Sequence, residues 1–153
     1  MIEIRRAKLS DAGDIRVLNH ANLPEKYSIE FIRYILAAEG AHYIVEAEGM
    51  PIGYILAPIE RAASIVYRKL PGPIGHIVSV AVDAKYRRRG IGRELIKRVI
   101  EDLKGKVIGI TLEVRVSNEP AISLYSSLGF STLEIWPNYY RDGENALVMI
   151  YRY

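Results

Sequence analysis

The sequence predicts a single α/β domain with a mixed, mostly antiparallel sheet of about seven strands and about four helices on its faces. Its 153 residues are 50% hydrophobic and 25% charged, which is the size and balance of one globular domain. Short apolar segments of strand length alternate with segments whose apolar residues recur at helical spacing. Because no internal repeat and no long linker interrupts this pattern, residues 1–153 are expected to form one domain.

Caps and turns set the expected elements in the first half of the chain. Ser10-Asp11 offers an N-cap to a first helix, Ser28 begins a second, and Gly40 is expected to end it. Glu48-Gly49 is typical of a hairpin turn, which makes its flanking strands antiparallel. The expected elements are a strand with Ile2 and Ile4, a helix with Ile15, Val17 and Leu18, a helix with Ile29, Ile32, Ile35 and Leu36, and strands over 42–46 and 53–57.

The second half begins with a continuous apolar run over 76–82, which favours a central strand covered on both faces. Asn118 can cap a later helix that Gly129 ends. The other expected elements are a helix with Ile91, Leu95, Ile96, Val99, Ile100 and Leu103 on one stripe, a strand over 111–115, a helix through Ala121, Leu124, Tyr125 and Leu128, and strands over 131–136 and 147–151.

Positive charge is concentrated in one segment of the chain. The net charge is +3, but residues 85–98 hold seven basic side chains against one acid, so the rest of the chain is net −3. This distribution favours one localised anion site over a broad nucleic-acid surface.

Several classes of protein are disfavoured by what the sequence lacks. Without cysteine there is no disulfide, zinc-thiolate site or cysteine nucleophile, and a cytoplasmic location fits best. The N-terminus lacks the apolar stretch of a signal peptide, and no apolar run reaches membrane-spanning length. The histidines His20, His42 and His76 show no metal-ligand spacing, and no Gly-x-Ser-x-Gly elbow supports a serine hydrolase.

The segment Arg87–Gly92 lies between the apolar run and the next helix, and it predicts an anion cradle. Arginines are unfavourable at a helix N-terminus unless an anion binds there, and glycines expose backbone N–H groups to phosphate oxygens. A P-loop is excluded because Arg93-Glu94 follows Gly92, and a dinucleotide fingerprint is excluded because Leu95 replaces its third glycine. The alternative is a solvated basic helix start with glycines for tight packing.

Arg87-x-x-Gly90-x-Gly92, after a strand and opening a helix, resembles the acetyl-CoA pyrophosphate loop of the GNAT N-acetyltransferases. The segment Asn118–Phe130 is similar to the late strand-helix block of that family. Four further segments are similar to the archaeal N-terminal acetyltransferases and the catalytic subunit of N-terminal acetyltransferase A: 22–27, 75–79, 112–118 and 139–144. The resemblance covers nearly the whole chain and departs from these relatives at Arg61–Pro73, Arg141 and Asn145.

The resemblance implies a GNAT acyl-CoA N-acyltransferase fold that binds acetyl-CoA and no metal. Backbone N–H groups from Arg88 to Gly92 would hold the pyrophosphate, and the pantetheine arm would run beside the strand Val80-Ala81-Val82. The residues expected at the coenzyme are Val80, Ala81, Val82, Arg87, Arg88, Arg89, Gly90, Ile91, Gly92, Asn118 and Tyr125.

Acetyl transfer to an amine also needs a base and a proton donor for the departing thiolate. His76 and Glu113, on adjacent candidate strands, are the favoured base pair, and Glu25 is a rival base or a substrate gate. The resemblance implies that Tyr125 is the proton donor for the thiolate. The alternatives are that Glu113 and Arg115 only form salt bridges to neighbours across the sheet, that His76 is a hydrogen-bonded edge residue, and that Tyr125 is a core aromatic.

The predicted function is transfer of acetyl from acetyl-CoA to the α-amino group of protein or peptide N-termini, by direct attack in a ternary complex. Acceptor-binding residues would be Leu23, Pro24, Glu25, Tyr27, Arg115, Tyr139 and Tyr140. Lysine, polyamine or other small-amine acceptors are an alternative, as is a non-enzymatic module for acyl-CoA or RNA. An auxiliary subunit on the helix over 28–38 and a ribosome association stay open, whereas a membrane and a specific nucleic acid are not expected as partners.

Overall fold

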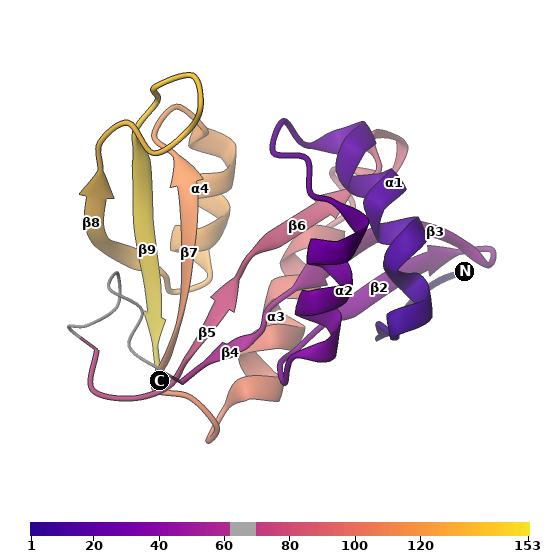
Figure 1. Ribbon diagram of the computed structural model, residues 1–153, viewed down its shortest axis with the longest axis horizontal. Coiled ribbons are helices and arrows are strands. Elements are labelled where there is room, and N and C mark those ends of the chain that lie inside the picture. Colours follow the sequence, from indigo (N-terminus) through magenta and orange to yellow (C-terminus); the bar gives the residue numbers. More distant parts are fainter. Residues whose placement is uncertain (62–69) are drawn as a thin grey trace.

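The computed structural model describes residues 1–61 and 70–153 and arranges them in two sheets that meet at β5 and β6 (Figure 1). One sheet has the strand order β1-β2-β3-β6 and the other β4-β5-β7-β9-β8. The strands are β1 (Ile2–Arg6), β2 (Tyr43–Ala47), β3 (Met50–Leu56), β4 (Ile59–Glu60), β5 (Ile74–Ile77), β6 (Ser79–Val82), β7 (Gly109–Arg115), β8 (Ser131–Trp136) and β9 (Ala146–Arg152). The α-helices are α1 (Ala12–Asn22), α2 (Ile29–Ala37), α3 (Ile91–Leu103) and α4 (Glu119–Ser127), and the 3-10 turns are η1 (Leu9–Asp11) and η3 (Ala84–Tyr86).

The expected mixed sheet with helices on its faces is confirmed. α1 and α2 cover one face of the four-stranded sheet, α3 covers the other, and α4 lies against the five-stranded sheet (Figure 1). Side chains alternate accordingly along β2, where Tyr43 and Val45 join the core under α3 and Ile44 joins the core under α1 and α2. Val17 is an exception to the predicted apolar stripe of α1, because it is 63% exposed.

The predicted hairpin between β2 and β3 is confirmed. The two strands pair antiparallel, with Tyr43 opposite Ile55 and Ala47 opposite Met50. Glu48 (φ 50°) and Gly49 (φ 79°) both have left-handed backbones, which a type I′ turn requires. β5 and β7 pair in parallel, which makes the five-stranded sheet mixed.

The prediction of one strand over 76–82 is wrong, because that run forms β5 and β6 in different sheets. β5 pairs with β7, whereas β6 pairs with β3. Side-chain alternation slips between the two: Val78 packs in the core under α1 and α2, and the hydroxyl of Ser79 lies on the same side, 2.7 Å from Tyr54 Oη. Two successive residues on one face mark a bulge, at which a strand bends. With this division and the two-residue β4, the described residues form nine strands where the sequence predicted about seven.

One predicted helix end and one predicted capping bond differ from the structure. α2 ends at Ala37 and the extended backbone of Ala38 terminates it, before Gly40. Gly40 has a different role, since a Cβ there would lie 2.4 Å from the Ala57 carbonyl oxygen. The Asp11 side chain makes no cap bond to α1 and instead accepts hydrogen bonds from Arg5 and the Lys8 backbone.

The remaining caps agree with the prediction. Ser28 accepts from the Phe31 N–H at the start of α2, and Asn118 accepts from the Ala121 N–H at the start of α4.

Most of the Arg61–Pro73 loop, residues 62–69, lies outside the described residues. Within the described ranges, no helix has both the length and the apolar character needed to cross a membrane.

Candidate active site

An acid–base pair lies where the two sheets separate. The β5–β7 ladder ends at Ile77 opposite Leu112, so Glu113 is the next residue of β7 beyond it, while β6 turns away to β3. His76 Nε2 lies 2.8 Å from Glu113 Oε1. Both side chains are largely buried, with 17% and 10% of their surfaces exposed. The two residues predicted as a pair from adjacent strands are therefore in direct contact.

Glu60 is a third member of this group, and the sequence analysis did not find it. Its Oε1 lies 2.8 Å from His76 Nδ1, on the side of the ring opposite to Glu113. Burial lowers the pKa of His76, but the hydrogen bonds and charges of Glu113 and Glu60 outweigh burial and raise the pKa to about 10. No motif marks Glu60, because β4 has only two residues and shows no periodicity.

The segment predicted as an anion cradle contains two residues with a left-handed backbone. Arg88 (φ 64°) and the N-cap Gly90 (φ 77°) are left-handed. The first backbone bond inside α3 runs from the Glu94 N–H to the Gly90 carbonyl, so the N–H groups of residues 91–93 have no helical partner and point out of its N-terminus. This arrangement fits the pyrophosphate of a coenzyme, since it combines backbone donors, the helix dipole and nearby arginines.

The three arginines of the cradle differ in their surroundings. Arg87 folds back to donate to the Val82 carbonyl (3.0 Å) and to Asn22 Oδ1 (3.0 Å), which ties the cradle to β6 and α1. All three arginines are exposed, and the Arg89 guanidinium lies over the ring of Tyr86.

The predicted arm residues lie on an edge strand, and Tyr125 lies on a helix next to the start of α3. β6 pairs with β3 along one edge, and no strand of the described chain pairs with its other edge. Tyr125 is buried on α4, and burial raises its pKa to about 12, so its hydroxyl keeps its proton at neutral pH. α4 adjoins the start of α3, because Leu124 lies 4.0 Å from the position of a Cβ on Gly92.

Arg115 joins two loops that hold predicted acceptor-binding residues, the α1–α2 loop with Glu25 and the β8–β9 loop with Tyr139 and Tyr140. One guanidinium nitrogen donates to Glu25 (2.6 Å) in the α1–α2 loop. Another donates to Asp142 (2.8 Å) and Glu144 (2.9 Å) in the β8–β9 loop. Its guanidinium also lies 4.1 Å from the centre of the Tyr140 ring. Asp142 and Glu144 lie in the quoted segment 139–144 but had no predicted role.

The tyrosines predicted to bind the acceptor also make contacts in this region. Tyr27 Oη donates to the Val78 carbonyl (3.4 Å) at the bulge, and Tyr139 contacts Tyr140 edge-on. Burial and the nearby charges of Glu113 and Glu25 raise the pKa of Tyr139. Of the other loop residues, Leu23 packs in the core under α1 and α2 and Pro24 is exposed.

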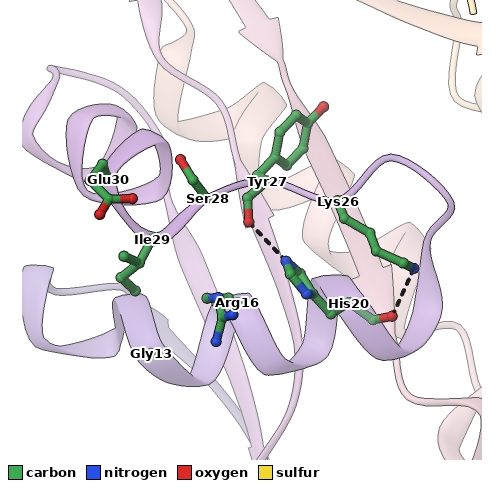
Figure 2. A pocket seen from close by; sticks show the side chains of 8 residues that line it. All are labelled: Gly13, Arg16, His20, Lys26, Tyr27, Ser28, Ile29 and Glu30. Carbon is green, nitrogen blue, oxygen red and sulfur yellow. Dashed lines mark hydrogen bonds between the residues drawn. The ribbon is translucent and has the colours of Figure 1, made fainter. Parts of the chain in front are cut away.

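A separate pocket of about 610 Å³ lies between α1 and the start of α2 and is lined by Gly13, Arg16, His20, Lys26, Tyr27, Ser28, Ile29 and Glu30. Figure 2 shows that Tyr27 contributes its backbone to this pocket, where the carbonyl accepts a hydrogen bond from His20, while its ring points away. The pocket contains none of His76, Glu113 or the cradle residues. His76 and Glu113 therefore lie at the split between the sheets and outside this pocket.

The fold and the anion cradle define the class as an α/β protein with the acyl-CoA N-acyltransferase fold. Residues 10–130 match the acetyltransferase (GNAT) family, and the chain belongs to that family.

Two named relatives and one solved structure are similar to this chain over most of its length. The chain is 40% identical over 95% of its length to an N-alpha-acetyltransferase of Sulfurisphaera tokodaii, of which 90% is covered. It is 34% identical over 97% of its length to the N-terminal acetyltransferase A complex catalytic subunit ard1 of Schizosaccharomyces pombe, of which 84% is covered. Among solved structures, the NatC complex bound to Gag peptide and CoA matches with a TM-score of 0.85 and 25% identity, over 99% of this chain and 98% of that one.

Proposed function

We propose that this protein transfers the acetyl group of acetyl-CoA to the α-amino group of protein or peptide N-termini. The observation that carries the proposal is the His76–Glu113 contact at the point where β6 leaves β7. The relatives named above as N-terminal acetyltransferases support this choice of acceptor. The amine would attack the thioester directly in a ternary complex.

The cradle and β6 would hold the coenzyme. The backbone N–H groups at the start of α3 and the side chains of Arg88 and Arg89 would bind its pyrophosphate, with Arg87 bracing the loop against β6 and α1. The free edge of Val80-Ala81-Val82 offers backbone groups to the pantetheine arm. Asn118 would contribute chiefly by capping α4. Bound acetyl-CoA supplies the acyl group as a thioester.

Proton transfers would be divided between two groups of the site. A peptide α-amine has a pKa of roughly 7.7 to 8.0, so one proton must leave it near neutral pH, and the His76–Glu113 pair would receive that proton. Tyr125 keeps its proton at neutral pH and would give it to the departing thiolate. Because the proton acceptor lies on β7 and the proton donor lies on α4, two separate groups would carry the two opposite transfers.

Glu25 would act at the acceptor entrance and not as the base. Its carboxylate accepts a short hydrogen bond from Arg115, and this contact holds the α1–α2 loop to the β8–β9 loop. Together with Tyr27, Tyr139 and Tyr140, this framework offers hydrogen-bonding groups to a peptide backbone. A free small amine would not need it.

All residues proposed for both substrates come from this one chain, so the purified chain is the material to test. A helical surface for an auxiliary subunit would be α2, on which Tyr34 is 72% exposed, and the fission-yeast relative is itself named as a subunit of a complex. Acetyl-CoA and newly made N-termini as substrates fit a cytoplasmic location.

The test is thiol release from acetyl-CoA with two matched peptides. One has a free N-terminus and no lysine, and the other has a blocked N-terminus and one internal lysine. We expect turnover on the first alone. Turnover on the second alone, or on neither while coenzyme still binds, would overturn the proposed acceptor.

A further inference from the structure

Glu60, His76 and Glu113 form one row across three neighbouring strands. His76 stands opposite Thr111 on β7, so Glu113, two residues on, is its diagonal neighbour on the same face of the sheet. On the other side, Glu60 of β4 stands opposite Ile74, two residues before His76, and is the second diagonal neighbour. The imidazole ring therefore lies between two carboxylates, and each ring nitrogen is 2.8 Å from a carboxylate oxygen.

The two contacts fix the number of protons in the row. An ionised carboxylate only accepts hydrogen bonds, and a neutral imidazole has one donor and one acceptor nitrogen. A neutral ring here would turn a lone pair toward a carboxylate oxygen at 2.8 Å. Two protons must therefore lie on the two N···O lines, and the row as a whole carries a charge of −1 and not −2.

His42 provides the contrast within the same chain. Its Nδ1 accepts a hydrogen bond from the Ala57 N–H and its Nε2 donates to the Ala38 carbonyl, which is the pattern of a neutral ring. Burial lowers the pKa of His42, whereas the carboxylates raise that of His76. The two histidines are thus held in opposite protonation states by their partners.

We infer that Glu60 is a positioning residue whose charge keeps the second proton on His76, so that Glu113 stays ionised and is the group that accepts the proton of the acceptor amine. This inference rests on the proposed function. In the step, the ammonium form of the acceptor first gives one proton to Glu113: an N–H bond breaks, an O–H bond forms on Glu113, and the row changes from −1 to neutral. The neutral amine nitrogen then bonds to the acetyl carbon, the C–S bond breaks, and the thiolate takes the proton of Tyr125. The second N–H bond of the attacking nitrogen breaks, and its proton returns to the Tyr125 phenolate through solvent, which leaves the amide and the free thiol.

The charge of Glu60 matters because the proton between His76 and Glu113 can lie on either atom. With Glu60 ionised, an imidazolium between two negative groups is favoured, and Glu113 remains a base. Without that charge, the state with a neutral imidazole beside a protonated Glu113 has the lower free energy, because a neutral pair costs less to bury than an ion pair. Glu113 would then hold a proton before the substrate arrives. The charged groups facing the ring in the described chain are Glu60 from β4 and Glu113 from β7.

The experiment compares the wild type with Glu60→Gln, which keeps the shape and a hydrogen-bond acceptor but removes the charge. The first readout is the ¹⁵N spectrum of the His76 ring from pH 6 to 10, with no substrate present. We expect both ring nitrogens to be protonated at pH 7 in the wild type, and the pKa of the ring to fall by about one unit or more in the variant. Glu3→Gln, an exposed glutamate of β1, is the matched control and should change neither readout.

The second readout is kcat with saturating free-N-terminus peptide over the same pH range. We expect the Glu60→Gln to wild-type kcat ratio to be about 0.1 or lower at pH 7 and to rise at higher pH, where Glu113 loses its extra proton. KM for acetyl-CoA should stay the same. A merely structural role would lower activity equally at all pH values and leave the ring spectrum unchanged.

Two results would overturn the inference: a neutral His76 ring in the wild type at pH 7, or a Glu60→Gln variant with wild-type ring protonation and kcat. A wild type that shows the doubly protonated ring but acetylates neither peptide would instead overturn the proposed function. The role of Glu113 as base would fall with it, and the protonation of His76 would stand.

Discussion

At the scale of single residues, Glu113 is the one on which the proposed chemistry depends most. It is a largely buried acid within an apolar strand, and its partner His76 lies on the neighbouring strand. Such a residue is expensive to keep in a fold unless it is paired or has a task. In this protein it is paired, and the pair lies at the split between the sheets.

We expect Glu113→Gln to lower kcat by about 10² or more, because the amide cannot accept the proton of the amine. Acetyl-CoA affinity should change little, since the cradle is on another element. Steady-state kinetics and coenzyme titration measure the two effects. Glu101→Gln, an exposed glutamate on α3, is the control, and an unchanged kcat for Glu113→Gln would remove Glu113 from the mechanism.

Tyr125 allows a second test at this scale. Its buried phenol keeps its proton at neutral pH, as a proton donor must. We expect Tyr125→Phe to lower kcat by about 10² with the fold retained, because the ring stays and only the hydroxyl is lost. Tyr34→Phe, at an exposed position, is the control. Wild-type kcat in Tyr125→Phe would assign this tyrosine to the core alone.

At the scale of elements, the start of α3 is where local conformation and predicted binding coincide. Gly90 is left-handed and precedes the helix whose first N–H groups lack helical partners. No atom lies within 4 Å of the position of a Cβ on Gly90, so conformation and not space favours glycine there.

Gly90→Ala should therefore cost about 1 to 2 kcal/mol of unfolding free energy and weaken acetyl-CoA binding, because the cradle must distort to relieve the strain. Urea unfolding and coenzyme titration measure these effects. Gly13→Ala, in α1 with equally open space, should instead raise stability by about 0.5 kcal/mol and leave binding unchanged. Equal effects of the two substitutions would contradict this account.

Sequence patterns predicted this element and several others well, since their causes lie within a few residues of each other. The caps at Ser28 and Asn118, the hairpin turn at Glu48-Gly49 and the apolar stripe of α3 are all local. The predicted end of α2 was too late, because glycine at position 40 does not end the helix. It is there because the backbone of Ala57 approaches it closely. Elements are thus predictable where neighbours along the chain determine them.

At the scale of the whole molecule, ion pairs connect elements that are distant in the sequence. Arg115 binds the α1–α2 loop to the β8–β9 loop, and Arg5 of β1 binds both Glu46 of β2 and Asp11 at η1. The hydrogen bonds from Arg5 hold the pKa of Asp11 below its usual value, against the opposing effect of burial.

This lowered pKa predicts a pH dependence of folding stability. A carboxyl whose pKa is lower in the folded state stabilises the fold above its unfolded pKa of about 3.9 and loses that contribution as the pH falls through the folded value. Asp11→Asn should therefore cost about 2 kcal/mol at pH 7, and the difference from wild type should shrink progressively below pH 4. Urea unfolding at a series of pH values measures it. A difference that is constant from pH 7 to pH 3 would contradict the assignment.

The sequence by itself determined the candidate coenzyme loop at the anion cradle, the helix caps at Ser28 and Asn118, and the candidate pairing of His76 with Glu113. Tertiary structure alone decided that the run over 76–82 splits between two sheets, that Glu60 completes the row around His76, and that Arg115 engages Glu25. The physical reason is the separation along the chain of the residues that interact. Capping, turn geometry and periodicity act between neighbours in the chain, whereas the bulge, the diagonal contacts and the ion pairs depend on which strands come to lie side by side.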